Sequence, residues 1–280
     1  MEAIYEIMET ILPFEFVTYD FMKNAILAVI LLCPIFAILG TMIVNNKMAF
    51  FSDALGHSAL TGIAIGMMFG VANTNISMII FAIVFSIILN YVKHKTSYGA
   101  DTIISVFSSI AIALGLAILS SQGNFSKYSS YLVGDILGIT SQEILYLAIA
   151  FIVIVALWLL LFNKLHTVSI NASLAKSKGI NVKLIDNIFV IMIAIMVMLS
   201  IRWIGILLIN SLLILPAAAS RNIATNIRSY HGIALAISLL SGIIGLIISY
   251  YANIGAGPAI VIISGIFYLI TFSLKEKVKG

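Results

Sequence analysis

The sequence predicts an all-α polytopic membrane protein with about eight or nine transmembrane helices and one short re-entrant or interfacial segment. Composition is the first reason: 62% of the 280 residues are apolar, 9% are charged, and the mean hydropathy is +1.16. A soluble domain of this length has a much smaller apolar fraction. The second reason is that apolar stretches of about 20 residues, the length that crosses a bilayer, follow one another along the chain.

Nine stretches have the length of a transmembrane helix. They lie at residues 24–46, 50–71, 75–92, 100–121, 142–163, 184–201, 203–220, 231–252 and 256–274. Between the fourth and the fifth, "YLVGDILGIT" (131–140) is apolar but too short to cross, and two glycines interrupt it. A re-entrant or interfacial segment is expected there.

The first 23 residues differ from the rest of the chain. They contain five acidic residues and one lysine, whereas a signal peptide begins with basic residues. We expect residues 1–23 to form an amphipathic helix at the membrane interface. Residues 24–280 then form a single transmembrane domain, because no linker, low-complexity tract or obvious internal repeat divides them.

Basic residues predict which side of the membrane each loop occupies, because cytoplasmic loops retain Lys and Arg. With the C-terminus in the cytoplasm, three basic residues lie outside (Lys23, Lys127 and Arg202) and twelve lie inside: Lys47, Lys93, Lys95, Lys164, Lys176, Lys178, Lys183, Arg221, Arg228, Lys275, Lys277 and Lys279. A multi-pass protein with a cytoplasmic C-terminus is therefore expected. The net charge of +4 follows from the same bias and gives no reason to expect a nucleic-acid partner.

Residues 50–66, "FFSDALGHSALTGIAIG", place ionisable side chains inside an apolar stretch. On a helix Asp53, His57 and Thr61 lie at four-residue spacing and form one polar stripe. A second stripe consists of small residues, which let a neighbouring helix approach closely: Ala54, Ser58, Gly62 and Gly66.

The polar stripe predicts a site for a divalent cation. An ionisable residue within a membrane span is costly unless it is paired or hydrated, and it usually marks a transport pathway. A carboxylate and an imidazole one turn apart suit zinc, manganese or iron, and two ligands leave the site open for release. Two structural alternatives remain. Asp53 and His57 satisfy each other and hold the helix in register, or Asp53 caps the helix start.

Further polar residues stand in a late span. Asn210 and Ser211 precede Pro216, which cannot donate a hydrogen bond to the carbonyl of Leu212 and is expected to kink the helix. Together with Thr61, these three residues are candidates for a pathway or a gate. An interhelical hydrogen bond combined with a packing kink is the alternative.

The other histidines and the one cysteine carry less information. His94, His166 and His231 stand beside basic or polar residues, and we expect them in solvated loops. Cys33 lies in an apolar run and is expected to serve packing. A single cysteine excludes an intrachain disulfide and a cysteine-rich metal site.

The stretch "NASLAKSKGINVKLID" (171–186) is the longest polar segment after the N-terminal one. Its Ala/Leu/Lys-rich middle followed by Gly179 predicts a short helix that ends in a glycine cap and contacts a partner. The sequence contains no G-x-x-x-x-G-K-[ST], H-E-x-x-H, G-x-S-x-G or paired-cysteine motif. We therefore expect that the chain is not an enzyme and that any ATP hydrolysis takes place on another polypeptide.

Five segments, in order along the chain, resemble the integral-membrane permeases of ABC transporters that import zinc, manganese and sometimes ferrous iron. They are "GTMIVNNKMAFFSDALGHSALTGIAIG" (40–66), "YLVGDILGIT" (131–140), "LAKSKGI" (174–180), "GILLINSLLILPAAASR" (205–221) and "GLIISYYANIGAGPAIVI" (245–262). The first contains the Asp-x-x-x-His core of the family's second-helix signature, at Asp53 and His57.

This resemblance implies a homodimeric permease in a bacterial-type plasma (inner) membrane. Its expected partners are a cytoplasmic ATP-binding subunit, an extracytoplasmic metal-binding protein and a second copy of itself. Asp53 and His57 are implied to contact the transported metal, with zinc favoured over manganese and then iron, and no cofactor is expected to be bound permanently. The ATPase is implied to dock on one cytoplasmic segment: Ala175, Lys176, Ser177, Lys178, Gly179 and Ile180.

Two other classes of function stay open at this point. A proton-coupled secondary transporter would use Asp53 and His57 as coupled metal and proton sites, and it would depend on a proton gradient instead of ATP. An intramembrane metalloenzyme would need a general base or a nucleophile near the metal, and no motif supplies one.

Overall fold

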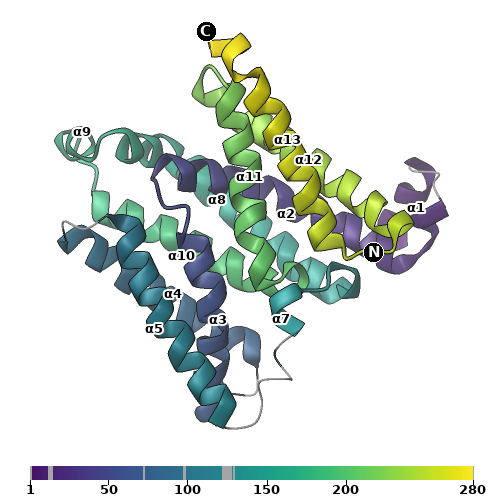
Figure 1. The fold of residues 1–280 in the computed structure, drawn as a ribbon, viewed down its shortest axis with the longest axis horizontal. Coiled ribbons are helices and arrows are strands. Elements are labelled where there is room, and N and C mark those ends of the chain that lie inside the picture. The colour runs from purple at the N-terminus through teal and green to yellow at the C-terminus, as the bar shows by residue number, and fades with distance from the viewer. Residues whose placement is uncertain are drawn as a thin grey trace. The chain divides into compact units, whose positions relative to one another are not determined.

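The computed structural model describes residues 2–11, 15–71, 73–96, 99–121, 128 and 130–279, and every regular element in this part of the chain is a helix (Figure 1). The α-helices are α1 (Glu2–Ile11), α2 (Asp20–Asn45), α3 (Phe51–Met68), α4 (Thr74–Lys95), α5 (Ala100–Ser121), α7 (Ser130–Val133), α8 (Ser141–Ile170), α9 (Ala172–Ser177), α10 (Val182–Ile204), α11 (Ile206–Ile223), α12 (Ile227–Ala252) and α13 (Ala256–Lys279). Two 3-10 helices are η1 (Glu15–Thr18) and η2 (Ile136–Gly138). The expected all-α class is confirmed.

Each of the nine predicted spans corresponds to one long helix. Eight of these, all except α3, are long and apolar enough to cross a membrane. α3 has 18 residues, and polar and small side chains lower its apolar content. Since 13 of these residues are buried, α3 is surrounded by protein and does not need the apolar surface that faces lipid.

The short segment between α5 and α8 does not cross. α7 and η2 have four and three residues, and Gly134 separates them with a φ of +71°. The carboxylate of Asp135 then caps η2 by accepting a hydrogen bond from the Leu137 N–H at 3.1 Å. The predicted break at the glycines is thus seen in the backbone.

The N-terminal segment contains α1 and η1, and residues 1 and 12–14 of the predicted interfacial segment lie outside the described residues. Lys23 forms ion pairs with Glu9 at 2.6 Å and with Asp20 at 3.2 Å. The one base of this acidic segment is therefore neutralised by two of its acids. The placement of residues 1–23 at a membrane interface stays a prediction.

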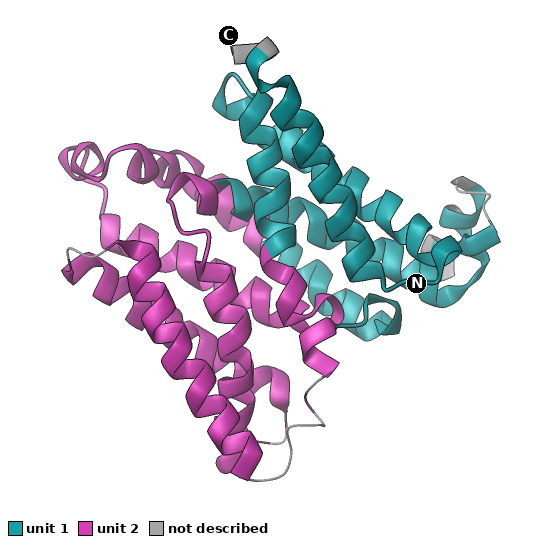
Figure 2. Ribbon diagram, viewed as in Figure 1, with its two compact units in different colours: residues 1–41, 134–153, 211–280 teal, residues 42–133, 154–210 magenta. Residues whose placement is uncertain are grey.

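The chain divides into two compact units, which Figure 2 shows in different colours. Unit 1 comprises residues 1–41, 134–153 and 211–280, and unit 2 comprises residues 42–133 and 154–210. α2, α8 and α11 each begin in one unit and end in the other.

In unit 1, α12 packs against α13 and the first part of α2. The Ser238 hydroxyl donates to the carbonyl of Cys33 at 3.0 Å, and Thr41 Oγ1 lies 2.7 Å from Nδ1 of His231. His231 is buried, so its expected position in a solvated loop is wrong. The reason is that Asn226, five residues before the apolar window begins, caps α12, which puts His231 in the second helical turn.

In unit 2, α3 packs against α4, α5 and α10. The small-residue stripe makes these contacts close. A Cβ on Gly66 would lie 2.1 Å from the Ser77 hydroxyl oxygen of α4, and a Cβ on Gly115 of α5 would lie 2.8 Å from the Thr61 nitrogen of α3. Neither position has room for a side chain, which confirms the packing role predicted for small residues at this helix.

Candidate functional site

Asp53 and His57 lie one turn apart on α3, within unit 2. Nε2 of His57 is 3.7 Å from Oδ1 of Asp53, and the two side chains are 28% and 39% exposed. The distance exceeds that of a normal hydrogen bond. The two side chains therefore do not form a normal hydrogen bond with each other, and each is partly exposed.

The separation suits two ligands of one cation. With metal–ligand bonds of about 2.1 Å, tetrahedral geometry places two donor atoms about 3.4 Å apart. The observed distance between Nε2 and Oδ1 is 3.7 Å. A small rotation of either side chain would shorten it to the tetrahedral value. The residues thus fit a zinc-like ion without any movement of the helix backbone.

Asp53 does not cap α3. The N-cap position belongs to Phe50, and no side chain makes a capping hydrogen bond there. Asp53 stands in the third position of the helix, where the helix dipole favours a carboxylate. The capping alternative is therefore wrong, and the position leaves the carboxylate oxygens available.

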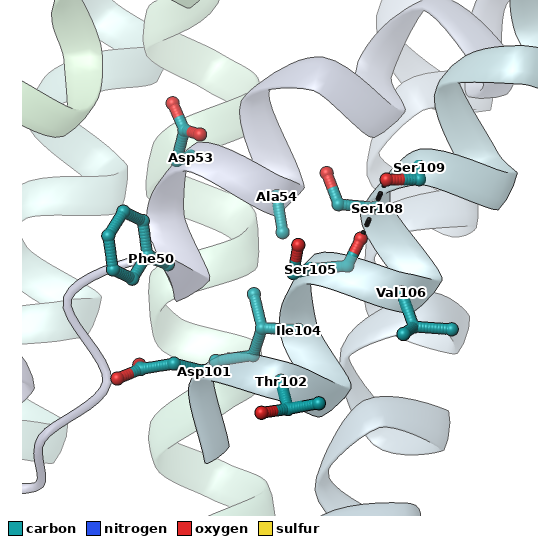
Figure 3. Close-up of a pocket in the computed structure, with 10 residues that line it drawn as sticks. All are labelled: Phe50, Asp53, Ala54, Asp101, Thr102, Ile104, Ser105, Val106, Ser108 and Ser109. Carbon is teal, nitrogen blue, oxygen red and sulfur yellow. Dashed lines mark hydrogen bonds between the residues drawn. The ribbon is translucent and has the colours of Figure 1, made fainter. Parts of the chain in front are cut away.

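A pocket of about 510 Å³ adjoins Asp53 (Figure 3). Phe50, Asp53 and Ala54 form its α3 side. Its other side comes from the first turns of α5: Asp101, Thr102, Ile104, Ser105, Val106, Ser108 and Ser109. Carboxylates and hydroxyls thus gather beside the candidate metal ligand. The serines were not singled out from the sequence, because their proximity to Asp53 depends on how α3 and α5 pack.

Thr61, the third member of the polar stripe, is buried. Its hydroxyl donates to the main-chain carbonyl of Ala111 on α5. This bond and the close approach of Gly115 hold α5 against α3. The structure thus places Thr61 in the seam between the two helices, one turn beyond His57.

Asn210 is tied to the start of α3. Its side-chain oxygen accepts a hydrogen bond from the Ser52 hydroxyl at 2.5 Å, and Ser52 directly precedes Asp53. Asn210 thereby fixes the first turn of α3 from within the same unit. Ser211 and Pro216 follow on α11 but belong to unit 1, so this candidate group is divided between the two units.

The segment of residues 175–180 has the predicted glycine cap. The Ile180 N–H donates to the Ala175 carbonyl at 3.0 Å, and the Gly179 N–H donates to the Lys176 carbonyl at 3.0 Å. Gly179 has a φ of +73°. This is the Schellman motif, in which a left-handed residue ends the helix.

The exposure of this segment suits contact with another protein. Ala175 is fully buried against unit 2, whereas four consecutive residues are exposed: Lys176, Ser177, Lys178 and Gly179. α9 also packs on α10. The segment is therefore anchored on one side and open on the other.

Two further histidines have partners that sequence reasoning missed. Nε2 of His94 lies 2.9 Å from Oδ2 of Asp186, which links the end of α4 to the start of α10. His166 is buried and stacks edge-on against Phe162 at 4.4 Å between ring centres. The expected solvated position of His166 is therefore wrong. His94 is exposed, as expected, but it lies in a helix and not in a loop. In both cases the helix, α4 or α8, continues beyond its apolar window.

No group of three or more His, Cys, Asp or Glu side chains is arranged to hold a metal ion among the residues that the structure describes. The Asp53–His57 pair therefore offers two candidate ligands within this part of the chain. A bound ion would take its remaining ligands from water, from hydroxyl or carbonyl oxygens, or from another chain.

The helices and the pair define a polytopic membrane protein with two candidate metal ligands on one helix inside its packed core. The family model of the ABC 3 transport family matches residues 18–275. The chain belongs to this family.

Two relatives whose names state a transported metal align with most of the chain. The high-affinity zinc uptake system membrane protein ZnuB of Haemophilus influenzae is 32% identical over 260 residues, which are 92% of this chain and 99% of ZnuB. The manganese import system permease protein ScaB of Streptococcus parasanguinis is 28% identical over 259 residues, which are 92% of each chain.

The fold is also similar to a solved structure. A chain of PsaBC from Streptococcus pneumoniae in complex with Fab aligns with a TM-score of 0.79 and 25% sequence identity, covering 99% of this chain and 100% of that one. The resemblance noted in five separate motifs therefore extends over the whole fold.

Proposed function

We propose that this chain is the membrane permease subunit of an ATP-driven importer of a divalent transition metal. The observation that carries the proposal is the Asp53–His57 pair, set on a packed helix of an ABC 3 family chain with its donor atoms 3.7 Å apart. Relatives named as a zinc uptake system membrane protein and a manganese import system permease support the same function.

Asp53 and His57 contact the metal as it passes. A carboxylate and an imidazole bind borderline cations well, and two protein ligands make a site that exchanges its ion. Zinc is favoured over manganese and then iron. The zinc-uptake relative supports this order through its identity, whereas the ligand chemistry of the pair suits any of the three ions.

ATP hydrolysis takes place on a separate cytoplasmic subunit that docks on residues 175–180. The anchored and exposed segment with its Schellman cap supports this contact. An extracytoplasmic metal-binding protein delivers the ion, and a second copy of the chain completes the permease. The protein lies in a bacterial-type inner membrane with its C-terminus in the cytoplasm, in accordance with the twelve basic residues on that side.

Metal uptake by single-residue variants tests the proposed role of the pair. Asp53→Ala or His57→Ala should lower ATP-dependent uptake by about 100-fold or more, since each removes one of two protein ligands and second-shell changes alone cost 10- to 100-fold. Uptake is measured in proteoliposomes with the ATPase subunit and the metal-binding protein present. His94→Ala, which lies outside the pair, is the matched control.

Uptake that persists in both variants would show that the pair is structural. Uptake driven by a proton gradient in the absence of ATP would support the secondary transporter instead, an alternative that membership of the ABC 3 family does not favour.

Replacing Gly179 tests the docking segment. Gly179→Val forces a β-branched residue to a φ of +73°, a strained conformation that costs about 1–3 kcal/mol. The cap should open, and metal uptake should fall while the membrane protein remains folded, because the ATPase loses its contact. Co-purification of the ATPase subunit is the measurement.

Gly265→Val on α13, where a Cβ meets no atom within 4 Å, is the control. A cysteine introduced at Ser177 should also crosslink to the ATPase subunit. Full retention of the ATPase by Gly179→Val, with no crosslink from Ser177→Cys, would place the docking surface elsewhere.

A further inference from the structure

The pocket beside Asp53 is lined by several polar side chains in addition to the candidate metal ligand. Its lining carries two carboxylates, Asp53 and Asp101, together with four hydroxyl side chains, and none of its ten residues is basic. The hydroxyls belong to Thr102, Ser105, Ser108 and Ser109. Such a lining attracts a hydrated cation and contains no charge that repels it.

The polar residues of α5 follow one face of the helix. Asp101, Ser105 and Ser109 lie at four-residue spacing and are all exposed, as Figure 3 shows for their positions along the pocket. α5 is long and apolar enough to span the membrane. Asp101 is the second residue of α5, and a carboxylate on a membrane helix faces protein or water because contact with lipid is costly.

The Ser109 hydroxyl is oriented with its oxygen free to accept. Ser109 donates its proton to the main-chain carbonyl of Ser105 at 2.9 Å. Its oxygen lone pairs then remain available to a cation or to the water around it. Oxygen ligands of this kind hold a transition metal more weakly than a site that includes an imidazole.

The volume of the pocket suits an ion that keeps its water. A water molecule occupies about 30 Å³ in the liquid, so an ion with six waters needs about 200 Å³. The pocket offers about 510 Å³. A hydrated divalent cation fits without displacement of side chains.

The pocket lies at the lysine-rich end of unit 2. Its lining residues fall within 50–54 and 101–109, around the start of α3 and in the first turns of α5. α4 packs on both helices and ends at Lys95, so its last turn lies at the same end. The His94–Asp186 ion pair adds the start of α10 to this end, and with it Lys183. Positive residues of this density mark the cytoplasmic side.

We propose that this pocket is the cytoplasmic exit of the metal path, and that Asp101 with Ser105 and Ser109 forms a second, oxygen-only station for the ion after it leaves Asp53 and His57. The inference rests on the proposed function. Weak oxygen ligands next to a tighter pair let the ion take up water again before it enters the cytoplasm.

Thiol labelling tests whether water reaches this station from the cytoplasm. Cys33 is the single cysteine of the chain, so Cys33→Ala provides a background in which an introduced cysteine is the one reactive site. Ser105→Cys is then compared with Ile110→Cys, which is 53% exposed on the same helix but does not line the pocket. The probe is methanethiosulfonate ethyltrimethylammonium, a cation that does not cross membranes.

In inside-out vesicles that contain the full transporter, the probe should label Ser105→Cys at least about tenfold faster than Ile110→Cys. The reason is that placing the cationic probe at a lipid-facing site costs more than about 1.4 kcal/mol, the free energy that corresponds to a tenfold difference. In right-side-out vesicles this difference should disappear. Equal labelling rates of both cysteines from the cytoplasmic side would overturn the proposal.

Transport kinetics give a second readout. Asp101→Asn should lower the maximal uptake rate about fivefold and leave the half-saturating metal concentration unchanged. A fivefold change corresponds to about 1 kcal/mol, the attraction between an ion and a carboxylate in a hydrated site. An unchanged rate would contradict the role of Asp101. Asp53→Ala in the same vesicles separates the proposed exit from the proposed function. If Asp53→Ala abolishes uptake but the two cysteines are labelled at equal rates, the exit alone is overturned. If Asp53→Ala leaves uptake normal, the proposed function is overturned.

Discussion

α3 and α8 differ both in the apolar content of their sequences and in how much of each helix is buried. α8 has 30 residues. Its most apolar window of 18 residues has a mean hydropathy of 3.1, and 17% of that window is buried. α3 has 18 residues, 13 of them buried, and carries Asp53 and His57. The helix with the less apolar sequence is thus the more enclosed one.

The difference shows what selects the residues of each helix. Large apolar side chains such as Leu159 and Leu160 on α8 are 63% and 78% exposed, and any apolar side chain satisfies a lipid contact. On α3 three positions meet specific neighbours. Gly66 lies against Ser77 of α4, Ser52 bonds to Asn210 of α11, and Thr61 bonds to Ala111 of α5. Polar groups are retained inside the protein because partners or water satisfy them there.

Gly115→Ala tests the close packing of α3 most severely. The added Cβ would lie 2.6 Å from Thr61 Oγ1 and 2.9 Å from Thr61 Cα, so the α3–α5 seam must widen. Overpacking against backbone costs about 3 kcal/mol, and most of the metal uptake should be lost with it. The measurement is the midpoint of thermal unfolding in detergent, with uptake as the second readout.

Two control variants change positions that lack such contacts. Gly265→Ala adds the same methyl group where no atom lies within 4 Å, and Leu160→Ala removes apolar atoms from the exposed face of α8. Both should leave the midpoint nearly unchanged. If Leu160→Ala destabilises as much as Gly115→Ala, the distinction between an enclosed and a lipid-type helix is wrong.

Ser52→Ala should have a smaller effect. It removes the 2.5 Å hydrogen bond to Asn210, a loss of about 1 kcal/mol in a membrane protein. Since this bond fixes the turn that carries Asp53, the half-saturating metal concentration should rise while the protein still inserts. Ser273→Ala, whose hydroxyl bonds to the Leu269 carbonyl of its own helix, should change neither quantity. An unaltered half-saturating concentration in Ser52→Ala would mean that Asn210 does not position the site.

Much of the fold was predictable because lipid imposes a simple rule on sequence. Apolar windows of about 20 residues found every long helix, and Gly134 and Gly179 marked the breaks that the backbone shows at φ +71° and +73°. The ends of helices were less predictable. α4, α8 and α12 extend into polar residues, so His94, His166 and His231 lie in helices and not in loops.

The candidate site was predictable only where its residues share one helix. Asp53 and His57 stand four residues apart, so their pairing follows from helical geometry alone. The partners of the site come from other helices: Asn210 through Ser52, Ala111 through Thr61, and Asp101 across the pocket. Their proximity is set by packing between segments distant in sequence, which no local pattern contains.

X-ray absorption at the zinc edge tests directly whether the pair binds the cargo. The purified permease, loaded with one equivalent of Zn²⁺, should show a nitrogen and oxygen shell at about 2.0–2.1 Å with the outer scattering of one imidazole. His57→Asn should remove the imidazole signal, and His94→Gln, a histidine outside the pair that bonds to Asp186, should preserve it. An imidazole signal that persists in His57→Asn would contradict the assignment of Asp53 and His57 as the metal-contact pair.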